Sequence, residues 1–191
     1  FITYFPNCIP PTRISRNTQV LLDFVTEHKD VIIKPLDNMG GKGIFRITEV
    51  NDNAESKLRS ITKNGTGFIM AQKFLPEIAA GDKRILLIDG KPVPYALARV
   101  PTNTNLKGNL AQGAIGKGIE LTDRDKWICD QVGSKLSDMG LVFVGIDIIG
   151  NYLTEINVTS PTCIRDLDNL FNISIAEQLM DAIEERKQEY M

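Results

Sequence analysis

Three features of the sequence predict an α+β fold. Apolar residues recur at helical spacing in residues 17–28 and 122–139, which predicts two helices. A β-branched run at residues 31–36 predicts a buried strand. The dipeptide Asp89-Gly90 separates two apolar runs within residues 85–100, which predicts an antiparallel hairpin. Helices and strands that interleave with an antiparallel hairpin are typical of the α+β class.

The remaining elements are predicted from caps, apolar runs and turn residues. Asn17 or Thr18 begins the first helix, Thr122 begins the longer one, and Gly140 ends it. In chain order, the other predicted elements are a strand at 44–47, a helix at 54–62, and strands at 67–75, 141–149 and 153–158.

Three further features concern the organisation of the chain. Ser174, with Glu177 three residues later, is a capping-box pattern that begins a last helix. Residues 101–118 are rich in glycine and poor in apolar residues, so we expect a long loop of the kind that acts as a lid. Because the chain starts at Phe1 and not at methionine, we expect it to be a piece of a longer protein.

Composition and charge argue against several classes of protein. The chain has 22 Lys and Arg residues against 24 Asp and Glu residues, so it lacks the broad basic surface that binds nucleic acid. Its single histidine, His28, is expected to be a solvated residue at the polar end of a helix rather than a catalytic base. The three cysteines are far apart, which argues against a zinc site and is typical of a reducing cytoplasm. No apolar run is long enough to span a membrane.

The stretch from Asp147 to Asn157 indicates a metal site. If residues 150–152 form a turn, Asp147 lies opposite Glu155, with the two side chains about 5 Å apart on one face of the sheet. Asn157 shares that face, because alternate residues of a strand point the same way. Two carboxylates and an amide oxygen that converge repel one another unless a cation binds between them. Oxygen ligands beside a bound phosphate are typical of a Mg²⁺ site. The alternative is a solvated polar face beside the turn. The apolar neighbours are expected to point the other way: Ile148, Ile149, Leu153 and Ile156.

Lys34 and the segment after it indicate a phosphate-bearing ligand. Lys34 lies inside an apolar run, where an ammonium group is costly unless it meets an anion. A lysine on an edge strand that extends to solvent is the alternative. The downstream glycine cluster offers backbone N–H groups to phosphates, although it differs from the Walker pattern and is weak on its own. That cluster comprises Met39, Gly40, Gly41, Lys42 and Gly43.

Two arginines provide further positive charge. Arg84 and Arg99 lie on the two arms of the predicted hairpin, near its open end. Two guanidinium groups at one end of a sheet suit anionic oxygens and can stabilise charge on a transferred phosphoryl group. Exposed pairing with Asp82 or Asp123 is the alternative. Lys107 and Asn109 lie on the glycine-rich loop and are expected to approach the ligand when that loop closes.

These residues, together with longer motifs, resemble a known family. The sequence is similar to the bacterial glutathione synthetases, which are ATP-grasp ligases, over essentially the whole chain. The motifs that carry the resemblance are VIIKPLDNMGGKGIFRI, MAQKFLPEIAAGDKRILLIDGKPVPYALARVP, KGNLAQGA and LVFVGIDIIGNYLTEINVTSPTCIR, at residues 31–47, 70–101, 107–114 and 141–165. The segments GKPVPYALARVP and TEINVTSPTCIR are specific to this synthetase within the superfamily.

The resemblance implies an ATP-grasp fold in which nucleotide binds between two α+β subdomains, at residues 1–73 and 74–191. It implies that ATP phosphorylates the carboxylate of γ-glutamylcysteine and that the amine of glycine attacks the acyl phosphate, which gives glutathione, ADP and phosphate. The small-molecule partners are then γ-glutamylcysteine and glycine, in a cytoplasmic protein that forms a homo-oligomer at full length.

The resemblance also assigns roles to residues. Two Mg²⁺ ions, for which Mn²⁺ can substitute, would be held by Asp147, Glu155 and Asn157. Arg84 and Arg99 would steady the acyl phosphate. The expected ATP contacts are Lys34, the phosphate loop of Met39, Gly40, Gly41 and Gly43, the adenine-lining Gln72, Lys73, Phe74 and Leu75, the ribose contact Asp82, and the lid residues Lys107 and Asn109. The expected peptide-substrate contacts are Ser160, Thr162 and Arg165.

The chain departs from the family pattern in three ways. Family members have roughly 300 residues in more than one domain and begin with an α/β domain that is absent here. They also carry an ATP-contacting lysine just ahead of the position of Phe1. Lys107 stands where some relatives carry arginine, which keeps the charge and changes its geometry. We therefore expect these 191 residues alone to bind nucleotide weakly and to turn over poorly in an assay coupled to ADP release.

Three other functions are compatible with the residues. One is another carboxylate–amine ligase of the same superfamily, which a screen of amine substrates separates. Another is a nucleotide-binding module without catalysis. The third is a purely structural role for the glycines and acids, which an absent thermal shift with ATP would support.

Overall fold

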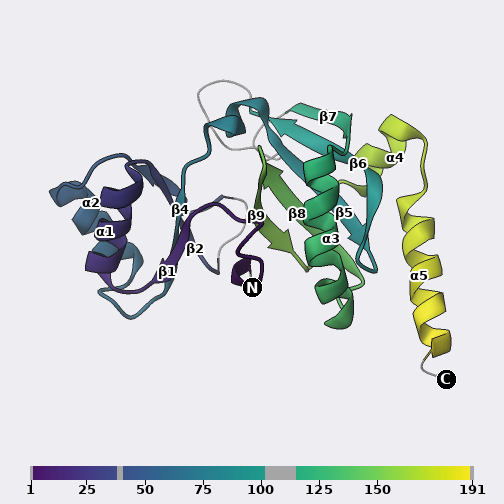
Figure 1. The fold of residues 1–191 in the computed structure, drawn as a ribbon, viewed down its shortest axis with the longest axis horizontal. Helices are drawn as coiled ribbons and strands as arrows, with labels where there is room; N and C mark the ends of the chain where they lie inside the picture. The colour runs from purple at the N-terminus through teal and green to yellow at the C-terminus, as the bar shows by residue number, and fades with distance from the viewer. Residues whose placement is uncertain (1, 38–40, 102–114, 190–191) are drawn as a thin grey trace. The chain divides into compact units, whose positions relative to one another are not determined.

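The computed structural model describes residues 2–37, 41–101 and 115–189 (Figure 1). The chain divides into two compact units, one of residues 10–76 and one of residues 1–9 together with residues 77–191. Each unit is an antiparallel sheet with helices packed on it, so the α+β prediction is confirmed. The first nine residues belong to the later unit, where the backbone N–H of Leu153 donates to the Cys8 carbonyl at 2.8 Å.

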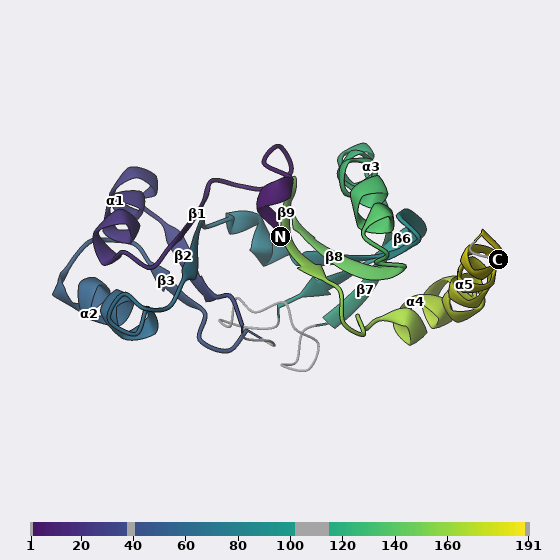
Figure 2. The same ribbon diagram turned by 90° about the horizontal axis from the view of Figure 1, so that it is seen from below.

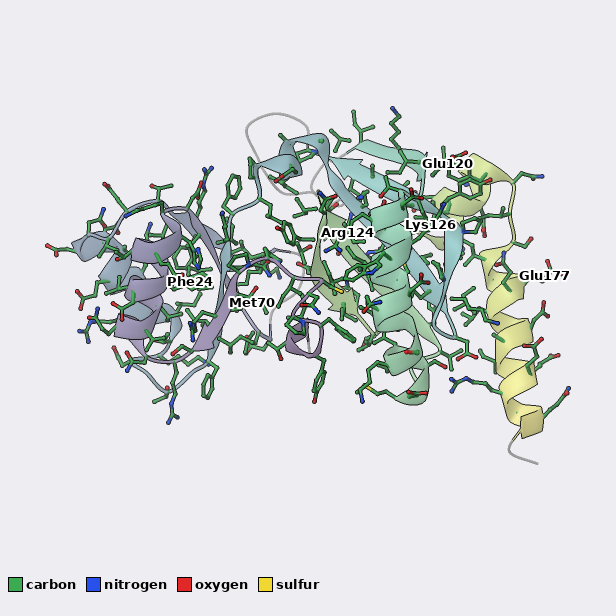
Figure 3. The ribbon with its side chains drawn as sticks, in the orientation of Figure 1. Phe24, Met70, Glu120, Arg124, Lys126 and Glu177 are labelled. Carbon is green, nitrogen blue, oxygen red and sulfur yellow. The ribbon has the colours of Figure 1, made fainter. Side chains whose placement is uncertain are left out.

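The unit of residues 10–76 is a four-stranded sheet in the order β1-β4-β2-β3. Its elements are β1 (Thr12–Ser15), α1 (Thr18–His28), β2 (Val31–Pro35), β3 (Phe45–Ile47), α2 (Asp52–Ile61) and β4 (Ile69–Lys73). Leu21 and Phe24 of α1 pack with Ile33 of β2 and Leu58 of α2 in one buried cluster. Figure 3 shows Phe24 on the sheet-facing side of α1.

The other unit is a five-stranded sheet in the order β7-β6-β5-β8-β9. Its elements are η1 (Ile2–Tyr4), η2 (Pro76–Ala80), β5 (Asp82–Ile88), β6 (Lys91–Val100), β7 (Ile115–Glu120), α3 (Asp123–Asp138), β8 (Phe143–Ile149), β9 (Tyr152–Asn157), α4 (Ile164–Phe171) and α5 (Ile175–Glu189). Figure 2 shows α3 on one face of this sheet and α4 and α5 on the other. Among the described residues, no helix has the length and apolar character that a membrane span requires.

Side chains of β5 point alternately to the two faces of the sheet, and those on one face meet both an apolar cluster and charged residues. Leu86 and Ile88 belong to the buried cluster that includes Leu167 of α4 and Ile175 of α5. Arg84 lies on the same face, because side chains two residues apart in a strand point the same way. The sheet face that carries Leu86 and Arg84 is therefore apolar near the β5–β6 turn, where α4 and α5 cover it. The same face is charged near the open end of the hairpin.

The predicted caps of the two main helices are confirmed. The Asn17 side chain accepts from the backbone N–H groups of Gln19 and Val20 at the start of α1. Thr122 and Asp125 form a capping box at the start of α3, and Asp125 also accepts a hydrogen bond from Lys83 of β5. On the same helix, Arg124 donates to the carbonyl of Asn151 at 3.0 Å and to that of Asn7 at 3.2 Å (Figure 3).

The structure adds two elements that were not predicted and corrects two predictions. Strand β1 and helix α4 lie where no element was expected. Residues 115–118 of the predicted loop belong to strand β7, which pairs with β6 along its whole length. The side chain of His28 is 18% exposed and packs edge-on against the Phe24 ring at 4.3 Å, so it is largely covered rather than solvated.

Asp89, in the β5–β6 turn, anchors α5. Its Oδ1 accepts from Arg186 Nε at 2.9 Å and from Ser137 Oγ of α3 at 2.7 Å, and these bonds lower the Asp89 pKa from its ordinary value.

We expect Asp89→Asn to lower the free energy of unfolding at pH 7 by up to about 1 kcal/mol, because the pair is partly exposed. Because the pKa of Asp89 is lower in the folded protein than in the unfolded chain, its ionised carboxylate stabilises the fold at pH values above the unfolded pKa of about 3.9. This stabilisation is lost as the pH falls through the folded-state pKa. Urea unfolding should therefore separate the two proteins at pH 7 and show the difference shrinking below about pH 4. A difference that persists unchanged in acid would contradict the ion-pair explanation.

Candidate functional site

Strand register brings five charged side chains of the β5–β6 and β8–β9 hairpins together. Arg84 lies opposite Asp147 across β5 and β8, and Asp147 lies opposite Glu155 across β8 and β9. On the other arm of the β5–β6 hairpin, Arg99 lies opposite Asp82. The expected proximity of Arg84 and Arg99 is confirmed, because both contact the same carboxylate. We define the Asp147 cluster as Asp147 with the side chains that form hydrogen bonds or ion pairs with its carboxylate or with Arg99, namely four charged residues and one amide in all: Asp82, Arg84, Arg99, Asp147 and Asn157.

Asp147 is the centre of the cluster and is 2% exposed. Arg84 donates from Nε to Oδ1 and from Nη2 to Oδ2, the latter at 2.9 Å. Arg99 Nη2 lies 3.0 Å from Oδ2, and Asn157 Nδ2 donates to the same oxygen at 3.3 Å. Two guanidinium groups therefore share one buried carboxylate.

A second carboxylate orients Arg99. Asp82 accepts from Arg99 Nε at 2.7 Å and from Nη2 at 2.6 Å, which is the bidentate geometry of a strong arginine–carboxylate pair. Pairing with Asp82 was the alternative to a phosphate-binding role, and the structure shows that pairing in a largely buried setting: the Arg99 side chain is 9% exposed and that of Asp82 is 15% exposed. The expectation that Asp82 contacts a ribose stays a prediction.

The electrostatics favour the charged forms of Asp147 and both arginines, whereas burial raises the pKa of Asp82 above its ordinary value despite its pairing with Arg99. Burial alone would raise the pKa of Asp147, but the hydrogen bonds and charges of Arg84 and Arg99 outweigh it and lower that pKa. Burial likewise disfavours the charged form of Arg99, yet the two neighbouring carboxylates raise its pKa above the ordinary value. Asp147 and the two arginines are thus held as full charges on one face of the sheet, beside the Asp82 carboxyl that pairs with Arg99.

The β8–β9 hairpin has the predicted acid pair but a different turn. Asp147 pairs with Glu155, and Gly145 pairs with Asn157, as the sequence predicts. Tyr152, expected in the turn, instead begins β9 and pairs with Ile149, so the turn is one residue shorter. The shorter turn and the predicted Asp147–Glu155 pair are compatible because β9 has a bulge between Leu153 and Glu155. Thr154 is the extra residue of that bulge. Ile149 lies two residues after Asp147 on β8 and therefore shares its face, so the expectation that Ile149 points the other way is wrong.

The donor set fits a hard divalent cation. A carboxylate oxygen has two lone pairs, and among the described residues Oδ1 of Asp147 accepts from one donor, Arg84 Nε. Asn157 uses its amide nitrogen toward Asp147, which leaves the amide oxygen as an acceptor. Glu155 is exposed on the same face. Three oxygen ligands of this kind are what Mg²⁺ or Mn²⁺ prefers.

The segment after β9 borders the cluster. Pro161 is buried, and a Cβ built at Gly145 would lie 2.8 Å from Pro161 Cβ and 3.1 Å from Arg84 Cδ. Gly145, which sequence reasoning missed, thus leaves the space through which Arg84 reaches Asp147. A glycine inside a buried strand was the available signal. Of the expected substrate contacts, Ser160, Thr162 and Arg165 are all exposed in or just after this segment, and Ser160 has a left-handed φ of 45°.

Lys34 and Gln72 form the candidate site in the unit of residues 10–76. Lys34 Nζ donates to Gln72 Oε1 at 2.9 Å, and Gln72 Nε2 donates to Thr12 Oγ1 at 3.0 Å. Strand β2 lies between β4 and β3, but β3 pairs only with residues 31–33. Among the described residues Lys34 has a strand partner on β4 alone, so the alternative of a lysine at a sheet edge is not contradicted. The expected nucleotide contacts of both residues stay predictions.

The other expected nucleotide contacts lie around the end of β4 and in the glycine segment. Lys73 ends β4, and the Phe74 ring carries the Arg46 guanidinium 3.8 Å above its centroid. Leu75 is buried. Gly41 and Gly43 have left-handed φ values of 73° and 74°, which favour glycine. Four expected contacts lie outside the described residues: Met39, Gly40, Lys107 and Asn109.

Comparisons with known proteins identify the family of the chain. The family model described as the ATP-grasp domain of prokaryotic glutathione synthetase matches residues 1–172. Glutathione synthetase from Pseudomonas aeruginosa is 54% identical over 183 residues, which cover 96% of this chain and 58% of that protein. The chain thus spans just under three fifths of the length of this curated relative.

Solved structures show the same fold at low sequence identity. The crystal structure of D-cycloserine synthetase DcsG superposes with a TM-score of 0.73 at 15% identity and covers 97% of this chain and 67% of that one. The ATP-grasp ligase PsnB, in a complex with Mg, ADP and a variant of its minimal precursor, superposes with a TM-score of 0.64 at 19% identity, with coverage of 94% and 54%. The predicted ATP-grasp fold is therefore confirmed. On the extent of the family match and the identity to its members, the chain belongs to the ATP-grasp domain family of the prokaryotic glutathione synthetases.

Proposed function

We propose that the chain is the ATP-using part of a ligase that joins glycine to γ-glutamylcysteine. In the proposed reaction ATP phosphorylates the acceptor carboxylate, and the amine of glycine displaces phosphate from the acyl phosphate to give glutathione, ADP and phosphate. The Asp147 cluster carries the proposal, because it combines two buried, pre-oriented guanidinium groups with an oxygen donor set in a chain of this family. Phosphoryl transfer depends mainly on such positioning and charge, and it needs no histidine.

Arg84 and Arg99 are the proposed catalytic residues. Carboxylates hold both side chains before any substrate arrives, so little reorganisation is needed when negative charge develops on the reacting oxygens. Asp147, Glu155 and Asn157 would hold two Mg²⁺ ions, with Mn²⁺ as a substitute. When bound, such ions neutralise phosphate charge and orient the phosphoryl group.

The unit of residues 10–76 supplies further proposed nucleotide contacts. Lys34 would bind phosphate with the help of the glycine segment, because its amine is already oriented by Gln72. The remaining proposed nucleotide contacts are Gln72, Lys73, Phe74 and Leu75 for the adenine and Asp82 for the ribose. Ser160, Thr162 and Arg165 are proposed contacts of the peptide substrate.

The proposal extends to cellular context. A cytoplasmic location is supported by three buried cysteines that remain free thiols, which suits a reducing compartment. A homo-oligomeric state at full length and small molecules as the only reaction partners are parts of the same proposal.

Glu155→Gln tests the function in a protein of the relatives' full length that carries these residues. Glu155 is exposed, so the substitution should leave the urea midpoint unchanged, while losing a charged metal ligand should slow ADP release about 100-fold. The assay couples ADP release to γ-glutamylcysteine and glycine, and product is identified as glutathione.

The outcomes separate the candidate functions. Loss of Mg²⁺-dependent ATP binding in the variant, together with no turnover in the unsubstituted protein, would favour a binding module over an enzyme. ADP release with a different amine in place of glycine would indicate another carboxylate–amine ligase. Full activity of the Glu155→Gln protein would contradict the proposed metal site.

A further inference from the structure

We infer that Thr154 is a positioning residue whose hydroxyl fixes a β-bulge and thereby keeps Glu155 on the metal-binding face beside Asp147. The inference rests on the proposed function, because it concerns the metal site of that reaction. It is carried by the strand register, by one buried hydrogen bond and by the burial of Thr154.

The register shows why a bulge is needed. At the turn end of the hairpin, Ile149 pairs with Tyr152 and Ile148 pairs with Leu153. If the ladder continued regularly, the next residue, Thr154, would lie opposite Asp147. Glu155 would then lie opposite Ile146 and point to the other face, because a shift of one residue reverses every side chain.

The observed pairing avoids this reversal. Asp147 pairs with Glu155, so Thr154 is the extra residue of β9 and has no counterpart on β8. The regular alternative would direct a carboxylate to the face of Ile146 and Ile148, both 0% exposed, and would turn Ile156 to the other face. The bulge therefore selects which face of the sheet receives the carboxylate.

The Thr154 side chain holds the bulge closed. Its Oγ1 donates to the backbone carbonyl of Asp147 at 3.1 Å, across the point where the ladder shifts. The residue is only 5% exposed, so the hydroxyl cannot exchange this partner for bulk water without local opening. The same bond fixes the backbone of Asp147, whose carboxylate is the centre of the cluster. Thr154 thus links the two acidic ligands through the backbone, since it precedes Glu155 and bonds to the main-chain carbonyl of Asp147.

The test compares Thr154→Val with Thr154→Ser in the protein of full family length. Valine keeps the β-branched shape and removes the donor, whereas serine keeps the donor and removes a methyl group. Mn²⁺ binding in the presence of ADP, followed by the electron paramagnetic resonance signal of free Mn²⁺, gives a dissociation constant without turnover. We expect valine to weaken Mn²⁺ binding about 10-fold, as the loss of a supporting contact around a metal site does, and serine to restore near-native binding.

A matched control removes a similar hydroxyl elsewhere. Thr26 Oγ1 donates to the Leu22 carbonyl at 3.0 Å within α1, and Thr26→Val should leave Mn²⁺ binding unchanged. Native-like Mn²⁺ binding by Thr154→Val would overturn the inference. So would equal weakening by serine and valine, because the packed methyl group would then be the cause.

Amide hydrogen exchange keeps this inference distinct from the proposed function. Exchange at the Glu155 amide reports the bulge without metal or substrate, and it should be faster in Thr154→Val than in Thr154→Ser. If the unsubstituted protein bound no Mn²⁺ with ADP and made no glutathione, the proposed function would fail, while exchange would still decide the role of the hydroxyl. Equal exchange in native and valine proteins would refute that role.

Discussion

Asp147→Asn should abolish the proposed ligase activity and also destabilise the fold. The substitution removes the charge that Arg84 and Arg99 share while both guanidinium groups stay buried. Breaking a buried ion pair by removing one partner costs about 3–5 kcal/mol. The free energy of unfolding should fall by that amount in urea titrations of the chain. ADP release by a protein of full family length should fall about 100-fold or more, because a metal ligand is also lost.

Asp89→Asn is the matched control for this substitution. Asp89 also binds an arginine through a carboxylate and lies on the same β5–β6 hairpin, at its turn end. It contacts no member of the Asp147 cluster among the described residues, so its loss should leave ADP release unchanged. Equal destabilisation by the two substitutions would show that burial does not distinguish the two carboxylates.

Gly145→Ala should disable the proposed site through Arg84 without removing any functional group. A Cβ at this position would lie 2.8 Å from Pro161 Cβ and 3.1 Å from Arg84 Cδ, so one of the two must move. Overpacking of this kind costs about 1–3 kcal/mol in the free energy of unfolding. Displacement of Arg84 by even about 1 Å should lower the rate of ADP release about 100-fold.

Gly67→Ala provides the control for an added methyl group. A Cβ there would meet the Thr62 carbonyl oxygen at 3.5 Å, which is an ordinary contact, so stability and activity should both stay near native. A Gly145→Ala protein with native activity would show that the contact with Arg84 relaxes at no functional cost.

Local signals predicted much of the fold correctly. The caps at Asn17 and Thr122 and the β5–β6 hairpin each depend on residues close together in the chain. Helix α4 was missed because Cys163 at its N-cap has a left-handed φ of 92° and makes no side-chain capping bond. Strand β1 was missed because it is four residues long and becomes a strand only by pairing with β4, more than fifty residues later.

The candidate site was partly predictable for a similar reason. The acid pair follows from counting along one hairpin, although the count was right only because the bulge at Thr154 compensates for a shorter turn. The contact of both Arg84 and Arg99 with one carboxylate was not predictable, since it requires β8 to pair with β5, which places Arg84 opposite Asp147, 63 residues later. Sequence patterns express such long-range neighbours only weakly.

The chain order of the two units bears on how the protein is made. Residues 1–9 leave the ribosome before residues 10–76, yet the strand whose Leu153 bonds to Cys8 emerges only after the whole of residues 10–76 and most of the later unit. The inserted unit has its own core and can form during synthesis, since domains generally fold as units. The leading segment must wait about 140 residues for its partner, which at roughly 5–20 residues per second is a delay of several seconds or more. Cys8 is buried in the finished protein, and before β9 is made its backbone lacks the Leu153 partner, so oxidation of this thiol competes with the late arrival of that strand.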